Sequence, residues 1–310
     1  MFRVFTAAGG PSKGAKGRVD MTLRFSRFGR LAAGVPAGFL AAALGVQVRA
    51  ADLIGQPTPG GIAFQPAASH IREEVIWFHD WILLPIITFI TLLVLGLLIV
   101  VIVRFNKRSN PTPARWSHNT PIEVAWTVGP VLILMFIAIF SFRLLFEEHD
   151  MPRPYMTVKV TGRQWNWDYE YPDQKIPAYT STVMSEADAK ARNVPYKLAA
   201  NAPMFAPVNQ VVRVQVTGED VIHSFSVPAF GIKIDAIPGR LNETWFKADR
   251  TGVFYGQCSQ LCGIDHAFMP IEVHVVSQSD FDAWVASKAP KPAPVPAASP
   301  AAVPAAPAPA

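Results

Sequence analysis

The chain has 310 residues, half of them hydrophobic, and a formal net charge of +5 at pH 7. The basic excess lies in the first 50 residues, which hold eight Lys and Arg and one acid, so the remainder has 20 bases and 22 acids. This distribution argues against a nucleic acid as partner. The length allows two domains, but the long apolar runs reduce the soluble part to one.

Residues 1–50 have the parts of a secretory signal peptide. A basic stretch is followed by an apolar run over 31–46 and a small-x-small cleavage site, Val48-Arg49-Ala50. A first transmembrane helix is the alternative, but the run is short and broken by Gly and Pro. We expect cleavage after Ala50, which leaves 51–80 as an extracytoplasmic segment, and Met21 is an alternative start.

Two later apolar segments are long enough to cross a membrane, and we expect a transmembrane hairpin over 81–144. The first helix covers about 81–103 without a charge and the second about 124–142. The loop at 104–121 carries bases and no acid, so the positive-inside rule places it in the cytoplasm and both termini outside. A buried hairpin of a soluble protein is disfavoured by the length of the first segment.

From Tyr155 the hydrophobic period changes to two. Apolar and polar residues alternate in four stretches, at 156–160, 165–171, 212–216 and 271–275. Strict alternation is typical of half-buried strands in an antiparallel sheet, so residues 155–277 predict a β-sandwich or barrel. In the second stretch, we expect Trp167 and Tyr169 to lie in the core.

Residues 175–209 interrupt this pattern, with a short helix expected at 185–192 and another at 280–287. Residues 288–310 are mostly Pro and Ala, which predicts a disordered tail because such a segment buries too little surface to fold. The folded domain expected at 145–287 has 17 acids and 12 bases. An acidic outward domain attracts basic partners; acidity that serves only solubility is the other interpretation.

The chain has only two cysteines, Cys258 and Cys262, in the string Gly256-Gln-Cys-Ser-Gln-Leu-Cys-Gly263. A lone pair in an oxidising compartment is usually a disulfide. His266 and Met269 change this expectation, because thiolate, imidazole and thioether are the donors that copper prefers. Two thiolates can bridge two metal ions, each with one terminal imidazole, so a second histidine must come from elsewhere.

His223, just after the predicted strand at 212–216, is the best candidate for that second histidine. A helix is an alternative structure for the stretch from 258 to 269, because its four donors at 258, 262, 266 and 269 would share one helical face. Glycines and Pro270 between strand-like segments favour a loop instead. A tetrahedral zinc site is the remaining alternative, and it is disfavoured because methionine is a poor zinc ligand.

At these residues the sequence resembles subunit II of the haem–copper cytochrome c oxidases. The matching strings are Glu219–Ser224, Ile234–Asn242 and Tyr255–Pro270, and the match extends from about Trp81 to Val276. The resemblance implies a membrane-anchored all-β protein: a two-helix transmembrane hairpin followed by a cupredoxin-like β-barrel or sandwich. It also implies a dinuclear copper A centre with these ligands: His223 and His266 as terminal ligands, Cys258 and Cys262 as bridges, Met269 as a weak ligand, and the backbone carbonyl of Gln260.

The resemblance further implies a function. Copper A would take electrons from cytochrome c and pass them to haem in subunit I, where oxygen is reduced to water and protons are pumped. The implied partners are subunits I and III and cytochrome c. The implied location is the bacterial inner membrane, with the copper domain on the periplasmic side. Because the chain has no Cys-x-x-Cys-His motif for a haem of its own, its electrons must come from a separate carrier.

Several single residues receive roles by resemblance. Trp165 would be the point where electrons enter, and Glu123 the mouth of a proton pathway into subunit I. The acids that would dock cytochrome c are Glu170, Asp173, Glu219 and Asp220. Taken without the resemblance, Trp165 is a core aromatic, Glu123 an interfacial acid at the end of a span, and each docking acid a solvated surface residue.

Gln260 departs from the family, which usually has glutamate there as a ligand of magnesium at the contact with subunit I. A neutral carboxamide binds a hard cation more weakly than a carboxylate, so the departure argues against magnesium.

Three other functions are alternatives for this sequence. A quinol oxidase subunit has the same fold but lacks the copper ligands, and nitrous oxide reductase is a soluble enzyme without the hairpin. A copper chaperone or assembly protein rarely combines this hairpin, aromatic strand and acidic face.

Overall fold

The computed structural model describes residues 55–288. The predicted signal peptide, the alternative start at Met21 and the Pro/Ala-rich tail beyond 288 lie outside the described residues.

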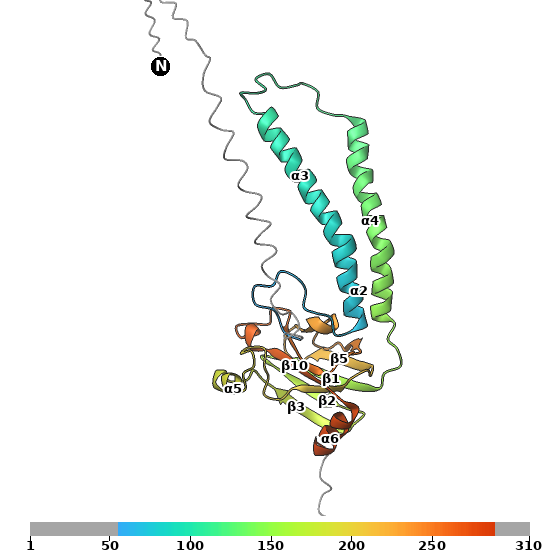
Figure 1. Ribbon diagram of the computed structural model, residues 1–310, viewed down its shortest axis with the longest axis vertical. Helices are drawn as coiled ribbons and strands as arrows, with labels where there is room; N and C mark the ends of the chain where they lie inside the picture. Colours follow the sequence, from blue (N-terminus) through green and yellow to red (C-terminus); the bar gives the residue numbers. More distant parts are fainter. Residues whose placement is uncertain (1–54, 289–310) are drawn as a thin grey trace, which may run out of the picture. The chain divides into compact units, whose positions relative to one another are not determined.

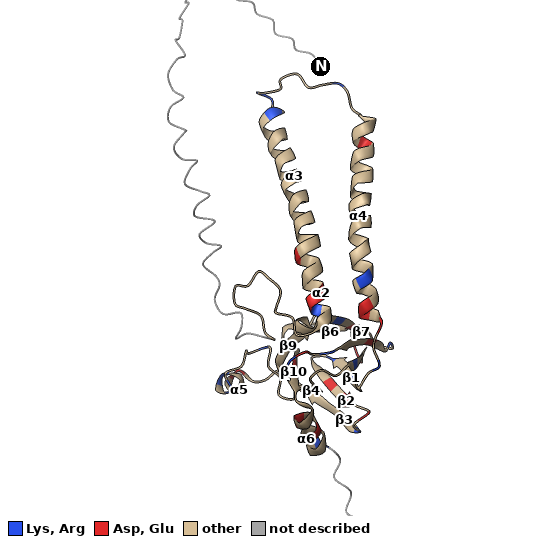
Figure 2. Ribbon diagram, turned by 45° about the vertical axis from the view of Figure 1, so that its right-hand side comes forward, with Lys and Arg blue, Asp and Glu red and all other residues tan. Residues whose placement is uncertain are grey.

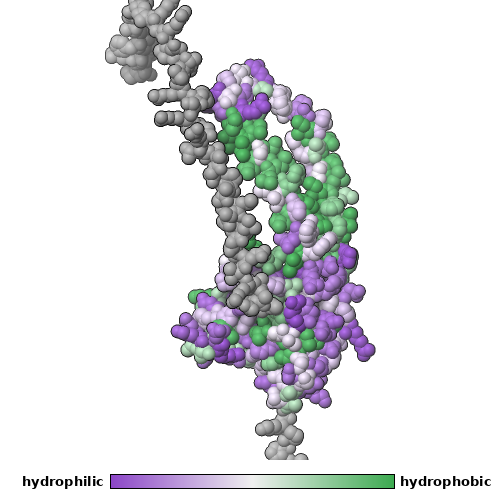
Figure 3. Space-filling model, in the orientation of Figure 1, coloured by the Kyte–Doolittle hydropathy of each residue, from purple (hydrophilic) through white to green (hydrophobic). Residues whose placement is uncertain are grey.

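Two long helices form the predicted hairpin (Figure 1). The first is continuous from His70 to Arg104 and consists of α2 (His70–Phe78), the π-helical turn η2 (His79–Leu83) and α3 (Leu84–Arg104). The second, α4, covers Thr120–His149. In the most apolar 18-residue stretch of each helix, none of the residues is buried within the protein. Figure 3 shows these apolar side chains on the outside of the hairpin, a surface that suits lipid.

Both helices extend beyond the apolar spans predicted at 81–103 and 124–142. Their first turns are fixed by side-chain caps: Ser69 accepts a hydrogen bond from Arg72 N, and Asn119 accepts one from Ile122 N. An N-terminal cap fixes where a helix begins, because it provides a hydrogen-bond acceptor for a free backbone N–H group of the first turn. This effect does not depend on the hydropathy of the residues. Because the helices extend beyond the apolar spans, charged residues lie near the helix ends, and the middle of each helix has none (Figure 2).

The remaining chain forms two five-stranded sheets, in agreement with the predicted β-sandwich. The first has the order β3-β2-β1-β5-β8 and the second the order β4-β10-β9-β6-β7. The strands of the first sheet are β1 (Met156–Arg163), β2 (Asn166–Tyr171), β3 (Ile176–Ser181), β5 (Val212–Gly218) and β8 (Asn242–Phe246). Those of the second are β4 (Met204–Pro207), β6 (His223–Val227), β7 (Ile232–Ala236), β9 (Gly252–Cys258) and β10 (Pro270–Val276).

The sheets are mixed, whereas the alternating pattern predicts antiparallel strands throughout. β1 pairs with β5 in parallel, and so does β10 with β4. Parallel neighbours need a long crossover. Between β1 and β5 the chain supplies one, through β2, β3, the segment that follows, and β4. Alternation indicates one buried face per strand but carries no information about strand direction.

The core lies between the two sheets, where the alternating residues predicted it. Trp167, Tyr169 and Val158 have no exposed surface, and Phe225 and Ile271 from the second sheet are equally buried. Trp167 meets Phe225 edge to face across the sandwich, with ring centroids 5.5 Å apart. The prediction that Trp167 and Tyr169 are core residues is confirmed.

Four short helical segments complete the domain. α5 (Glu186–Ala191) and α6 (Gln278–Lys288) confirm the two helices predicted at 185–192 and 280–287. The other two are 3₁₀ turns, η3 (Pro228–Phe230) and η4 (His266–Phe268). The segment from Cys258 to Met269 is thus a loop with one 3₁₀ turn, as its glycines and proline predict.

Candidate metal centre

His223 is the first residue of β6, and its side chain has no exposed surface. The imidazole lies edge-on to Trp167, with ring centroids 6.0 Å apart. The imidazole also lies against Gly162, near the end of β1. A Cβ at Gly162 would come within 3.0 Å of both the His223 and the Trp167 side chains. The absence of a side chain at 162 therefore makes room for the histidine.

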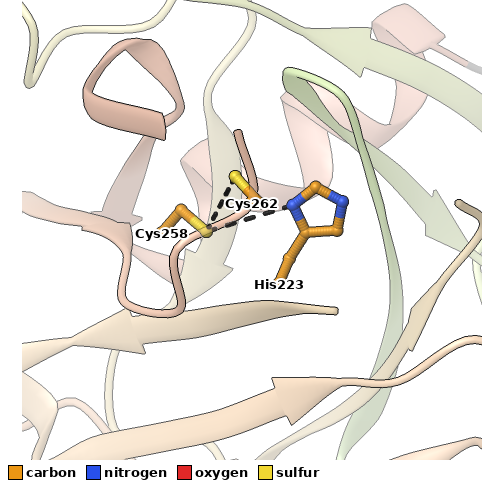
Figure 4. Close-up of side chains that lie close together, drawn as sticks. All are labelled: His223, Cys258 and Cys262. Carbon is orange, nitrogen blue, oxygen red and sulfur yellow. Dashed lines mark hydrogen bonds between the residues drawn. The ribbon is translucent and has the colours of Figure 1, made fainter. Parts of the chain in front are cut away.

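Strand pairing brings the first cysteine to this histidine. β6 pairs with β9 so that Phe225 stands opposite Cys258, two residues from His223. Cys258 Sγ lies 4.0 Å from His223 Nδ1 and 3.8 Å from Cys262 Sγ. Figure 4 shows the three side chains pointing toward one another, and their donor atoms all lie within 4.8 Å. Both cysteines are free and buried.

The remaining predicted donors come from the same loop. His266 Nδ1 lies 3.5 Å from Cys262 Sγ, and the carbonyl oxygen of Gln260 lies 3.3 Å from Cys258 Sγ. Met269 is almost fully buried, and its carbonyl accepts a hydrogen bond from Cys258 N at 3.1 Å, which closes the loop. All six predicted ligand residues therefore lie in one region.

This donor set fits a pair of soft or borderline metal ions. Two sulfurs lie side by side, each with one imidazole nitrogen near it: His223 at Cys258 and His266 at Cys262. Thiolate, imidazole and thioether favour copper over the hard cations that prefer oxygen. The resemblance implies two bridging thiolates with two terminal imidazoles, and these four side chains are near enough to one another to be candidates for those roles.

Asp220 orients His223 from behind. Its Oδ1 lies 2.8 Å from His223 Nε2, so that Nδ1 faces the sulfurs. Its two oxygens also accept hydrogen bonds from Val221 N and Gln164 N, at 2.6 and 2.7 Å. Burial raises the pKa of Asp220, but these hydrogen bonds outweigh it and lower the pKa overall. A carboxylate on the second nitrogen of a ligating histidine fixes the orientation of the ring. The resemblance implies a docking role for Asp220 and does not indicate this contact with His223, although the spacing of three residues is visible in the sequence.

The turn between β1 and β2 holds the second cysteine. Gln164 Nε2 donates to the carbonyl of Cys262 at 2.9 Å, and Trp165 Nε1 approaches the same oxygen at 3.3 Å. The next residue, Gly263, has φ +131°, and a Cβ there would come within 2.9 Å of Trp165. Trp165 therefore directly contacts the loop between β9 and β10, which carries the candidate ligands. Gln164 touches both halves of the site, through Asp220 and through Cys262, and nothing in its own sequence neighbourhood indicates this.

The thiol of Cys262 is protonated at neutral pH when no metal neutralises it. Burial and the neighbouring thiol of Cys258 together raise its pKa to about 12. A coordinated metal ion replaces the thiol proton, so metal binding here releases protons.

The other predicted functional residues lie at different distances from this site. Glu219 pairs with Arg163, which also lies 3.2 Å from Asp168, next to the β1–β2 turn. Glu170 pairs with Lys159 at 3.4 Å, midway along the β1–β2 hairpin. Asp173 accepts a hydrogen bond from Thr157 N at 2.7 Å. That bond lies at the far end of β1, about 20 Å from the turn at 3.3 Å per residue.

Two further predicted residues have local contacts of their own. Gln260 has an exposed side chain, and only its carbonyl faces the cysteines. Glu123 lies in the first turn of α4, where its carboxylate accepts a hydrogen bond from Asn119 N at 3.1 Å. Glu123 therefore helps to cap the second membrane helix.

Together the fold and the site define a class: a membrane-anchored β-sandwich protein with a buried centre of sulfur and imidazole donors. Comparison with known proteins agrees with this class. The protein-family model "Cytochrome C oxidase subunit II, transmembrane domain" matches residues 57–144. The family model "Cytochrome C oxidase subunit II, periplasmic domain" matches residues 156–276.

Similar proteins include "Cytochrome c oxidase subunit 2" of Cereibacter sphaeroides, 46% identical over 266 residues, which covers 80% of this chain and 88% of that one. "Probable cytochrome c oxidase subunit 2" of Rickettsia bellii is 50% identical over 233 residues, 75% of this chain and 86% of that one. A solved structure, the periplasmic domain of subunit II of cytochrome oxidase of Bradyrhizobium japonicum, is 54% identical. It covers 44% of this chain and 96% of that one, with a TM-score of 0.41.

The chain belongs to the cytochrome c oxidase subunit II family. It is a membrane protein and a subunit of a haem–copper oxidase. The predicted fold, a membrane hairpin followed by a cupredoxin-like sandwich, is confirmed.

Proposed function

We propose that this chain receives electrons from cytochrome c at a dinuclear copper A centre and passes them to haem in subunit I. There oxygen is reduced to water and protons are pumped. The observation that carries the proposal is the pair of free, buried sulfurs at 3.8 Å, each with an imidazole nitrogen beside it. When bound, copper supplies one-electron exchange, and no bond of a substrate is made or broken on this chain.

The protein's own contribution is to hold the six donors still. Cys258 and His223 lie on paired strands, and Asp220 fixes the ring of His223. Cys262 is held through its carbonyl by Gln164. When ligands are held in fixed positions, their geometry changes little between oxidation states, which favours fast electron transfer. Burial also excludes water from the sulfurs.

Electrons would enter at Trp165, whose half-buried indole donates a hydrogen bond to the carbonyl of Cys262. Acidic side chains around this point would steer the lysines of cytochrome c. Glu219 and Asp220 lie next to the β1–β2 turn, while Glu170 and Asp173 extend the acidic surface along the hairpin.

Several further assignments belong to the same proposal. Glu123, at the start of α4, would stand at the mouth of a proton pathway into subunit I, with subunit III as a second neighbour. After cleavage of the signal peptide following Ala50, the chain would lie in the bacterial inner membrane with residues 145–287 in the periplasm. Gln260 offers a carbonyl to copper, and its neutral side chain disfavours a magnesium ion.

The test uses the assembled oxidase, mixed rapidly with reduced cytochrome c. Wild-type enzyme is expected to show fast reduction of its copper absorption band, and His266→Asn to lose that phase. The matched control is His118→Asn, an exposed histidine in the loop between the membrane helices. An unchanged phase in His266→Asn would refute the proposed centre.

A further inference from the structure

The segment between β3 and β4, residues 182–203, has no part in the function described so far. It carries α5 and lies outside the sandwich in both Figure 1 and Figure 2. Its contacts converge on the ligand loop, defined here as residues 258–269. It touches the chain before this loop, within it and after it.

Before the loop, the segment packs on Tyr255 of β9, three residues ahead of Cys258. Tyr255 is almost fully buried by a small second core made with Met184, Ala189 and Ala199. This core is separate from the one between the sheets. Its apolar contacts fix the strand that leads into the loop.

After the loop, the segment binds Glu272 of β10, three residues beyond Met269. This carboxylate is 1% exposed, and its Oε2 accepts a hydrogen bond from Ala200 N at 2.6 Å. Its Oε1 lies 2.7 Å from His274 Nε2. A buried carboxylate without partners is costly, so these contacts hold the segment against β10. Glu272 pairs with Tyr255 in the β9–β10 register, so the two residues that the segment contacts lie side by side on neighbouring strands.

Within the loop, the segment reaches Phe268 through Lys197. The ammonium nitrogen of Lys197 lies 4.5 Å from the centroid of the Phe268 ring. Phe268 is the residue before Met269 and the second after His266, and all three belong to the turn around η4. A cation over an aromatic face is attracted by the ring quadrupole. Lys197 thus contacts the part of the loop that carries two candidate ligands, His266 and Met269.

We propose that residues 182–203 are a clamp that holds the ligand loop in its metal-binding conformation, with Lys197 and Glu272 as positioning residues. The proposal rests on the proposed function for the identity of the metal. The clamp itself is defined by contacts that need no metal. A loop ordered in advance avoids the entropic cost of ordering when the ions bind.

The experiment measures amide hydrogen exchange in the full-length, metal-free chain in detergent. Lys197→Met removes the cation and keeps the side-chain length. We expect exchange in residues 259–268 to become about two- to five-fold faster, the factor for an exposed cation–π contact. Lys197→Arg is expected to restore slow exchange. Lys190→Met, on the exposed side of α5, removes the same charge from the same segment and is expected to change nothing.

A second variant and a second readout keep the test independent of Lys197 and of activity. Glu272→Gln retains the shape of the side chain but weakens the bond to Ala200 N, and it is expected to speed loop exchange as well. In copper-loaded protein, Lys197→Met is expected to speed copper release to a chelator by a similar factor.

Unchanged loop exchange in both variants would overturn the clamp, and so would equal acceleration in β1, which would indicate general destabilisation. A chain that binds no copper but shows the loop effect would refute the proposed function and leave the clamp in place.

Discussion

The residues proposed as ligands of the metal centre come from two regions that the protein holds in different ways. His223 and Cys258 lie on neighbouring strands of one sheet, where backbone pairing fixes their separation. Cys262 and His266 lie on the loop that follows, whose position depends on side chains far away in the sequence, such as Gln164 and Lys197. A strand ladder resists single changes, whereas a loop held by a few contacts is sensitive to each of them. Changes in the strand region should therefore abolish the site or strain the fold, and changes in the loop supports should loosen it.

The largest effect is expected from Cys258→Ser, on the strand side. The hydroxyl is a poor ligand for copper, and loss of one bridge leaves the two ions with a single shared donor, Cys262. We expect copper content to fall to one ion per chain or none, with loss of electron uptake from cytochrome c. Metal analysis of purified oxidase measures this, with Ser259→Ala, an exposed neighbour, as the control. Two coppers per chain in the variant would contradict the bridging role.

A smaller effect is expected from Asp220→Asn, which keeps the size of the side chain but removes the charge behind His223. Partners of ligating histidines typically contribute about 10- to 100-fold in metal affinity. We expect copper affinity to fall within that range, as measured by competition with a chelator. Asp235→Asn, an exposed acid on β7, is the matched control. Equal affinity for the two variants would show that the contact with His223 has no part in binding.

Gly162→Ala tests the space around His223. The new methyl would lie within 3.0 Å of two fully buried rings, and overpacking of this kind costs about 1–3 kcal/mol. We expect the free energy of unfolding to fall by that amount, with partial loss of copper. Gly60→Ala has open space around it, although its φ of +68° adds some strain, and it should leave copper content unchanged. Full stability and full copper content in Gly162→Ala would mean that the histidine does not need this space.

The smallest effect concerns two acids at opposite ends of the β1–β2 hairpin. Glu219→Gln, next to the turn, should slow association with cytochrome c about two- to three-fold at low salt, since exposed charges contribute about 0.2–1 kcal/mol. Asp173→Asn, at the far end, should have a smaller effect. Stopped-flow rates at several ionic strengths measure both. A larger effect of Asp173→Asn would move the docking surface away from Trp165.

Much of the architecture could be predicted because it is local in sequence. Residues 81–103 contain no charge, which alone predicts a membrane helix, and alternation at 156–160 predicts a strand with one buried face. Four of the donors fall within twelve residues, so the ligand loop was visible without a structure. His223 was assigned because the loop offers only one imidazole.

The contacts that support the site could not be predicted, because their partners are far apart. Gln164 meets Cys262 across 98 residues and Ala200 meets Glu272 across 72. No periodicity in either neighbourhood indicates these pairs. The parallel pairing of β1 with β5 was missed for the same reason, since a strand's pattern shows which face is buried but not which strand lies beside it.

The most direct measurement is the copper content and spin-resonance spectrum of the purified, full-length chain after reconstitution. We predict two copper ions per chain and a spectrum in which one unpaired electron is shared equally by both, with Cys258 and Cys262 unavailable to thiol reagents. One copper per chain, or a covalent bond between the two sulfurs in the metal-loaded protein, would contradict the account.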